Sequence, residues 1–389
     1  FGSLNSPEHL AAARRIAGEG MVLLKNDGGV LPIDLGKTKT IAVVGENAVK
    51  MMTVGGGSSS LKVRHEYTPL EGIRAAVGDK AEVIYERGYV GDVTGNYNGV
   101  KTGQDLSEKR SEAQLIADAV AAARKADVVI FVGGLNKSDH QDCEGADRLQ
   151  YGLPYAQDRV IEALAEANPN LAVVMVSGNA VAMPWIDRVP AVLEAWFSGS
   201  EAGNALADVV FGAVNPSGKL PFTFPVRLED NSAHALGEYP GTDKVAYNEG
   251  IFVGYRWHDK EQLKPLFAFG HGLSYTEFKY GTVTLSATKV KRGEKLSAEV
   301  TVTNTGARDG AETVHWFISD PYCSITRPVK ELKHFEKQLI KAGETKTFRF
   351  DIDLERDFGF VNEDGKRFLE AGEYHILVQG QTVKIELID

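Results

Sequence analysis

The sequence has little cysteine, no long hydrophobic run and no excess of basic charge. Two Cys among 389 residues are too few for a disulfide scaffold or a Cys-rich zinc module. The longest apolar runs, at 126–135 and 171–177, are too short to cross a bilayer, so we expect no membrane partner. A net charge of −10 argues against non-specific binding of nucleic acid. These absences favour a globular enzyme or a binder of neutral ligands.

Length and composition indicate more than one folded domain. Hydrophobic residues make up 43% and charged residues 25% of the chain, which argues against extensive disorder, and 389 residues suggest two or three domains. The first residue is Phe1, and no signal-peptide pattern precedes the first expected helix. We therefore expect an internal starting point. Secreted, periplasmic and cytoplasmic locations all stay open.

The first 225 residues alternate between helix and strand patterns. Pro7 after Ser6 is a helix-start signal, and an apolar pattern continues from there to Asn26. Short, β-branched apolar runs predict buried strands at 40–45, 81–85, 127–133, 171–177 and 191–197. Amphipathic patterns predict helices at 69–77, 107–125, 154–167 and 201–211. This alternation predicts an α/β sandwich with a mostly parallel sheet at 1–225.

The rest of the chain changes character twice. Residues 226–279 have weak periodicity and many aromatic residues, so we expect an irregular connector packed between two domains, with a functional segment as the alternative. Residues 280–389 show short alternating runs separated by turn signals, which predict an all-β sandwich. Its expected strands are 296–303, 313–319, 345–352, 374–379 and 383–388.

The loop at 133–148 follows a predicted strand and is rich in charged side chains. Its candidates for chemistry are Asp139, Asp142, Glu144, Asp147, Lys137, His140 and Arg148. Ligands bind at the carboxyl edge of open α/β sheets, and an acid among other acids suits general acid/base work. The composition alone favours a solvated polar loop. The spacing fits neither an EF-hand nor a zinc site, so we expect no metal and no cofactor.

A second unusual segment is the glycine- and serine-rich stretch at 55–60. Glycine lets backbone approach a ligand closely, but the stretch lacks both the P-loop and the dinucleotide-binding spacing. A flexible turn is the simpler interpretation. No Gly-x-Ser-x-Gly nucleophile elbow occurs, which argues against an α/β-hydrolase, and the acidic neighbours of Cys143 would keep its thiol unreactive.

The order of motifs along nearly the whole chain resembles a known family. The motifs are Glu19–Asn26, Ile41–Gly45, Gly55–Ser59, Thr68–Gly72, Glu144–Arg148, Leu153–Pro154, Asn215–Pro221, Glu249–Arg256, Phe269–Tyr275, Val302–Gly306 and Arg327–Leu332. Together they resemble the carboxyl-terminal two domains of glycoside hydrolase family 3 of the β-glucosidase type, an α/β sandwich followed by a fibronectin type III-like module.

The resemblance assigns roles to four residues. It implies that Glu144 is the general acid/base, while the nucleophilic Asp belongs to an amino-terminal (β/α)8 barrel that this chain lacks. Ser58 matches the serine that approaches a sugar hydroxyl in the −1 subsite. Asp147 and Arg148 match the same motif as Glu144, and we expect them to shape the loop through a local ion pair.

The function implied is that of a retaining, exo-acting β-glucosidase of carbohydrate metabolism and cellulose degradation. Its substrates would be cello-oligosaccharides or aryl glucosides, and its partner would be the barrel, in the same protein or in a separate chain. The chain alone would then be inactive. A second copy of the chain, in a homodimer, is a further candidate partner. The alternative functions are a family 3 β-xylosidase or arabinosidase and a non-catalytic carbohydrate-binding protein, although the intact Glu144 motif counts against a pure binder.

The aromatic connector gains a hypothesis from the same resemblance. Tyr255, Arg256, Trp257 and Phe267 could contact a sugar at an outer subsite, because aromatic faces and Arg suit sugar C–H faces and hydroxyls. Packing between domains is the simpler interpretation of these four residues.

Overall fold

The computed structural model describes residues 3–53, 55, 57–61, 63–97, 99–146 and 148–389. The chain divides into two compact units. One comprises Phe1–Leu220 with His271–Tyr275, and the other comprises Pro221–Gly270 with Thr276–Asp389. Each unit has its own buried apolar core, and each is described by itself below.

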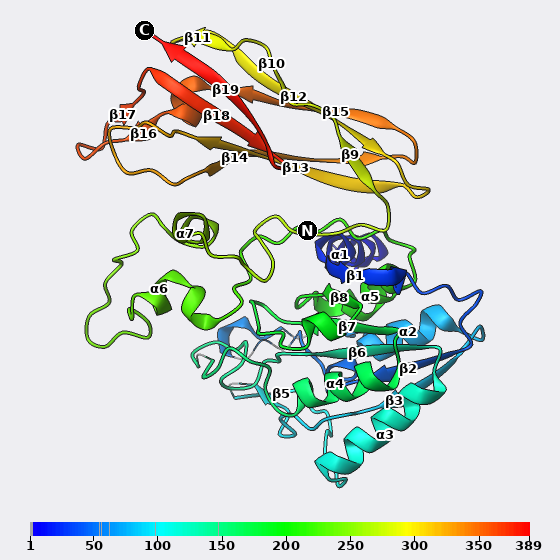
Figure 1. Ribbon diagram of the computed structural model, residues 1–389. Coiled ribbons are helices and arrows are strands. Elements are labelled where there is room, and N and C mark those ends of the chain that lie inside the picture. Colours follow the sequence, from blue (N-terminus) through cyan, green and yellow to red (C-terminus); the bar gives the residue numbers. More distant parts are fainter. Residues whose placement is uncertain (1–2, 54, 56, 62, 98, 147) are drawn as a thin grey trace. The chain divides into compact units, whose positions relative to one another are not determined.

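The first unit is built on a six-stranded sheet with the strand order β1-β8-β7-β6-β2-β3 (Figure 1). The strands are β1 (Val22–Asn26), β2 (Thr40–Val44), β3 (Glu82–Glu86), β6 (Val128–Gly134), β7 (Leu171–Val176) and β8 (Ala191–Glu194). All neighbours pair in parallel except β1 with β8. The central strands β6 and β7 are buried along their whole length, as their continuous apolar runs require. The predicted mostly parallel sheet is confirmed.

Helices cover the sheet of the first unit, and their ends follow local sequence signals. They are α1 (Pro7–Gly20), α2 (Pro69–Val77), α3 (Glu112–Lys125), α4 (Gln157–Ala167) and α5 (Ala202–Val210). Ser6 caps α1 by accepting from the His9 backbone N–H, and Thr68 forms a capping box with Glu71 at α2. Of these helices, α1, α2 and α5 bury their apolar residues against one face of the sheet. No helix of the described residues is long and apolar enough to cross a membrane.

The start of the chain differs from the prediction. The helix expected to run to Asn26 ends at Gly20, and Val22–Asn26 forms strand β1, antiparallel to β8. The run of three buried apolar residues, Val22–Leu24, points to both sides of the strand. Such a run fits a buried strand as well as a helix, and only its pairing with β8 decides between them.

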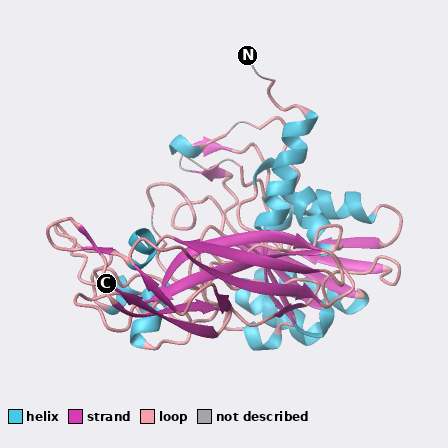
Figure 2. Ribbon diagram, turned by 90° about the horizontal axis from the view of Figure 1, so that it is seen from above, coloured by secondary structure: helices cyan, strands magenta, loops and turns pink. Residues whose placement is uncertain are grey.

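The second unit contains a β-sandwich. One sheet joins β9 (Phe278–Tyr280), β10 (Thr284–Leu285), β12 (Leu296–Asn304) and β15 (Thr345–Ile352). The other has the order β11-β19-β18-β13-β14, with β11 (Lys289–Lys291), β13 (Gly310–Ser319), β14 (Glu331–Ile340), β18 (Gly372–Val378) and β19 (Gln381–Ile388). Figure 2 shows these long strands side by side. Trp316, Phe348 and Phe350 lie in the core. The predicted β-sandwich is confirmed, although strand β14 was not predicted.

Two short hairpins lie outside the main sheets. They pair β4 (Asn96–Tyr97) with β5 (Val100–Lys101), and β16 (Phe360–Val361) with β17 (Arg367–Phe368).

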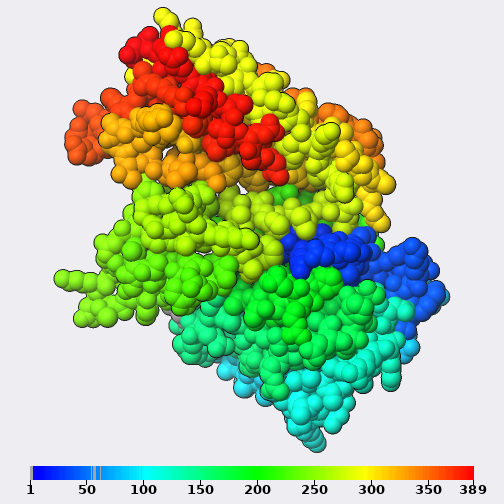
Figure 3. All heavy atoms as spheres, viewed as in Figure 1, coloured from blue at the N-terminus to red at the C-terminus, as the bar shows by residue number. Residues whose placement is uncertain are grey.

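The aromatic segment groups with the β-sandwich up to Gly270. It is less irregular than expected, because it contains the short helices α6 (Ser232–Ala235) and α7 (Tyr255–Glu261). The part of the segment around residue 240 lies at the surface (Figure 3), where the Tyr247 side chain is exposed. The domain boundaries 1–225, 226–279 and 280–389 stay a prediction.

Candidate active site

Two loops leave the same edge of the first sheet. Strands β2 and β6 are parallel neighbours, so the loops that follow them both begin at the carboxyl edge. The loop after β2 carries Ser58 in the 3-10 helix Gly57–Ser59, and the loop after β6 carries Glu144. This edge is where open α/β sheets bind ligands. The topology therefore brings the two predicted site residues together.

Ser58 and Glu144 are joined by hydrogen bonds. The Ser58 hydroxyl lies 2.8 Å and 2.7 Å from the two carboxylate oxygens of Glu144, and the Ser58 backbone N–H donates to Oε2 at 3.0 Å. Both side chains are exposed. The Ser58 hydroxyl, followed by its backbone N–H, stabilises the charged form and lowers the pKa of Glu144. In this arrangement Glu144 is therefore an ionised acceptor.

A buried carboxylate fixes the first of these loops. Glu66 accepts hydrogen bonds from the backbone N–H of Met52 at 2.5 Å and of Thr53 at 3.1 Å, and also from the Thr53 hydroxyl. Glu66 is buried, so its three donors are what keep a charged group stable there. Glu66 therefore links the chain that precedes Ser58, at Met52 and Thr53, to the chain that follows it.

A buried ionic cluster lies beneath the same edge. Glu46 follows β2 and forms ion pairs with Lys50 at 3.1 Å and with Arg87 at 2.7 Å. The backbone N–H of Gly91 donates to the same carboxylate at 2.6 Å. Sequence analysis missed this cluster. Its only signal was two charged residues four apart, directly after a buried strand.

The Glu144 loop is held at its base by polar contacts. The Asn47 side chain donates to the Leu135 carbonyl oxygen at 3.0 Å, which links the chain after β2 to the chain after β6. Ser138 donates to the Asp92 carboxylate at 2.7 Å, and the Asp92 carbonyl oxygen accepts from Lys50 at 2.8 Å. The loop base is therefore connected to the buried cluster.

Asp142, two residues before Glu144, connects its loop to the next strand of the sheet. Its carboxylate accepts from the Gly178 backbone N–H at 2.6 Å and from the Asn179 side chain at 2.5 Å, just after β7. The sequence analysis grouped Asp142 with the candidate acids. Its hydrogen bonds instead indicate a role in fixing the loop.

Arg148 is half-buried and holds backbone carbonyl groups. It donates to the carbonyl oxygens of Ala180 and Tyr151, each at 2.7 Å, and to the side chain of Asn179. Burial lowers its pKa from the ordinary arginine value. These contacts agree with a loop-shaping role. Asp147 lies outside the described residues, so its ion pair with Arg148 stays a prediction.

The four predicted sugar contacts of the aromatic segment belong to the second unit. Tyr255 accepts a hydrogen bond from the backbone of β14 at 3.0 Å, and Arg256 lies 3.4 Å from Glu331. Trp257 is buried, and Phe267 packs edge-on against another phenylalanine ring. Each has a packing role within its own unit, and sugar binding by these residues stays a prediction.

We also searched the described residues for a metal site. Groups of three or more His, Cys, Asp or Glu suited to hold a metal ion are absent from that part of the chain. Cys143 lies 3.6 Å from the Ala146 carbonyl oxygen within the Glu144 loop.

Comparisons with known proteins cover both units. The family model described as "Glycosyl hydrolase family 3 C-terminal domain" matches residues 21–275, and the model described as "Fibronectin type III-like domain" matches residues 312–382. The β-glucosidase BoGH3A of Bacteroides ovatus is 44% identical over 99% of this chain and 52% of that protein. The thermostable β-glucosidase B of Acetivibrio thermocellus is 41% identical over 95% of this chain and 46% of that protein. The chain thus spans about half the length of these curated relatives.

Solved structures agree with this assignment. The Bifidobacterium adolescentis GH3 β-glucosidase matches 99% of this chain and 54% of its own, with a TM-score of 0.86 and 34% identity. A Kluyveromyces marxianus β-glucosidase in complex with glucose matches 99% of this chain and 63% of its own, with a TM-score of 0.88 and 26% identity. On the family model, the relatives and the fold together, the chain belongs to glycoside hydrolase family 3.

Proposed function

We propose that the chain supplies the general acid/base, Glu144, of a retaining, exo-acting β-glucosidase. The substrates would carry terminal β-D-glucosyl residues, as cello-oligosaccharides and aryl glucosides do. The observation that carries the proposal is the meeting of Glu144 and Ser58, from two loops, at the exposed carboxyl edge of the sheet. The relatives named β-glucosidase support the substrate class.

The proposed reaction needs a second carboxylate. An Asp of a (β/α)8 barrel outside this chain would attack the anomeric carbon while Glu144 protonates the leaving oxygen. Glu144 would then deprotonate the water that releases glucose from the glycosyl-enzyme. Retaining hydrolysis requires the two carboxyl groups to lie about 5–5.5 Å apart. A site assembled from two domains would therefore depend on how the barrel and this chain dock.

The first step requires a protonated Glu144, yet Ser58 lowers the pKa of this carboxyl. Burial and a neighbouring carboxylate both raise a carboxyl pKa. Docking of the barrel with its nucleophile would supply both effects. If Ser58 then turns toward a sugar hydroxyl, Glu144 also loses the hydrogen bond that stabilises its charge. The hydrogen bond between Ser58 and Glu144 would thus be present in the site without sugar and absent once the sugar is bound.

The test is the variant Glu144→Ala in the protein that includes the barrel. We expect turnover of cellobiose to fall by about 10²–10⁴-fold, because a poor leaving group depends on general acid catalysis. Cleavage of an activated aryl glucoside should fall less in its first step, and azide should restore part of the rate by attacking the glycosyl-enzyme. The matched control is Asp139→Ala, which removes an exposed acid from the same loop.

Three results would contradict the proposal. Wild-type activity of Glu144→Ala on cellobiose would remove Glu144 from the reaction. Faster cleavage of aryl xylosides or arabinosides than of aryl glucosides by the wild type would instead assign the protein to a different sugar. A protein that binds glucosides without hydrolysing them would be a carbohydrate-binding protein.

A further inference from the structure

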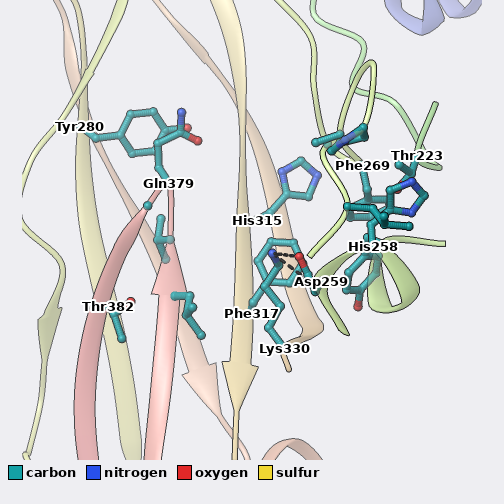
Figure 4. A pocket seen from close by; sticks show the side chains of 18 residues that line it. Thr223, His258, Asp259, Phe269, Tyr280, His315, Phe317, Lys330, Gln379 and Thr382 are labelled. Carbon is teal, nitrogen blue, oxygen red and sulfur yellow. Dashed lines mark hydrogen bonds and ion pairs between the residues drawn. The ribbon is translucent and has the colours of Figure 1, made fainter. Parts of the chain in front are cut away.

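A cavity of about 360 Å³ lies within the second unit, remote in sequence from Glu144. One wall is the five-stranded sheet with the β18–β19 turn, and the other is the segment that contains α7. Figure 4 shows side chains from both walls around it, with Tyr280, Gln379 and Thr382 on one side and His258, Asp259 and Phe269 on the other. Its volume is within the range of small-molecule sites, about 300–1,000 Å³.

Side chains of β13 alternate between the two faces of its sheet, and this alternation places aromatic rings at the cavity wall. Trp316 and Ile318 point into the sandwich core, so His315 and Phe317 lie on the opposite face of the strand. The ring of Phe317 packs against Tyr255 of α7, with the ring centroids 5.7 Å apart in an edge-on arrangement. These rings are held by one another and present a rigid apolar surface to the cavity.

The charges at the cavity are paired. Lys330 lies 3.0 Å from both carboxylate oxygens of Asp259, and Figure 4 shows this ion pair at the wall. The Lys330 ammonium also lies 5.5 Å from the centre of the Phe317 ring. A paired acid and base offer both acceptors and donors without a net charge. The cavity is therefore suited to a neutral ligand.

Two further polar groups at the wall lack hydrogen-bond partners within the described part of the chain. Nδ1 of His258 lies 3.1 Å from the Gly254 carbonyl oxygen, which can only accept, so in the neutral ring Nδ1 carries the proton and Nε2 is an acceptor. Neither Nε2 nor the Thr223 hydroxyl has a partner among the described residues, and both are buried. Buried polar groups are costly unless they are satisfied. Ligand hydroxyls, which both donate and accept, would complement them.

Gly270 keeps one side of the cavity free of a side chain. It has a φ of +80°, a backbone conformation that disfavours other residues, and a Cβ there would lie 3.4 Å from the His315 ring. Glycine at this position therefore lets the backbone lie close to the His315 ring at the cavity wall.

We propose that this cavity binds a neutral, hydroxylated ring of monosaccharide size. The C–H face of the ring would lie on the aromatic wall formed by Phe317 and its neighbours. Its hydroxyls would contact the Asp259–Lys330 pair and the unpartnered groups of His258 and Thr223. This site goes beyond the proposed function and does not depend on Glu144 or on a barrel.

The test is ligand-observed NMR on the 389-residue chain, titrated with methyl β-D-glucoside. We expect saturable binding, and at least a tenfold increase in Kd for Thr382→Trp, which fills the cavity from an exposed strand position. The control Thr347→Trp places the same ring at an exposed position of the other sheet and should bind as the wild type does. The double variant Asp259→Asn/Lys330→Gln removes both charges together, and its Kd should also rise at least tenfold.

Three results would overturn the inference. They are the absence of saturable binding, a wild-type Kd in both folded cavity variants, and binding of p-nitrophenol in place of the sugar, which would make the cavity an aromatic site. Glu144→Gln separates the two proposals. Loss of sugar binding in that variant would place the sugar at the Glu144 loop and contradict only the cavity inference, while unchanged binding would support the cavity.

Discussion

At the scale of single residues, one neighbouring hydroxyl contributes most to the lowered pKa of Glu144. The Ser58 hydroxyl is the largest influence that lowers the pKa of Glu144, ahead of the Ser58 backbone N–H. Ser58→Ala removes only the hydroxyl, so we expect the pKa of Glu144 to rise toward its ordinary value. A carboxyl-¹³C NMR titration of the 389-residue chain measures this directly. In a protein that includes the barrel, the alkaline limb of the kcat/KM profile, which reports the free enzyme, should move to higher pH, because Glu144 then stays protonated to a higher pH.

The neighbouring serine provides the control for this prediction. Ser59 influences the same carboxyl through its backbone N–H, which Ser59→Ala retains. That variant should leave the pKa of Glu144 unchanged. An unchanged pKa in Ser58→Ala would show that the hydroxyl contact does not persist in solution.

Sequence analysis identified both members of this contact but not the contact itself. Ser58 and Glu144 stand in recognisable motifs, whereas their meeting depends on β2 and β6 being neighbours in the sheet. The support beneath them was not predicted. Glu46 and Arg87 are 41 residues apart in the sequence and meet only in the folded chain, so no local sequence pattern predicts their ion pair.

At the scale of elements, helices α2 and α5 approach closely because two glycines lie at their contact. A Cβ built on Gly72 would lie 2.0 Å from the Gly203 carbonyl oxygen, and one on Gly203 would lie 2.0 Å from that of Thr68. Gly72→Ala must therefore push the two helices apart. We expect a loss of about 3 kcal/mol in unfolding free energy, the upper end for overpacking, because backbone cannot move aside as a side chain can.

The matched control is Gly20→Ala in α1, where a Cβ would meet nothing within 4 Å. Alanine favours helix over glycine by about 1 kcal/mol, so this variant should be neutral or slightly stabilising. Urea unfolding of both variants provides the comparison. Equal stability of the two would mean that α2 and α5 pack less closely than the structure shows.

Strand β14 was missed for a reason different from that for β1, because little of β14 is buried. β14 has exposed or half-buried side chains along nearly its whole length, including Phe335 and Leu339, so its apolar residues do not mark a buried face. Where apolar and polar residues do not alternate clearly, pairing with neighbouring strands determines whether a segment forms a strand. By contrast, the buried central strands β6 and β7 were predicted within one or two residues, since their apolar runs are short and rich in β-branched residues, which favours a strand over a helix.

At the scale of the whole molecule, the proposed chemistry makes this chain one half of a catalytic pair. The chain spans about half of its curated relatives, and the proposed nucleophile belongs to a barrel outside it. We therefore expect the 389-residue chain alone to hydrolyse p-nitrophenyl β-D-glucoside no faster than the unfolded chain does. A protein that includes the barrel should turn the same substrate over. Activity of the 389-residue chain that disappears in its Glu144→Ala variant would contradict this expectation, because the second carboxylate would then have to come from this chain itself.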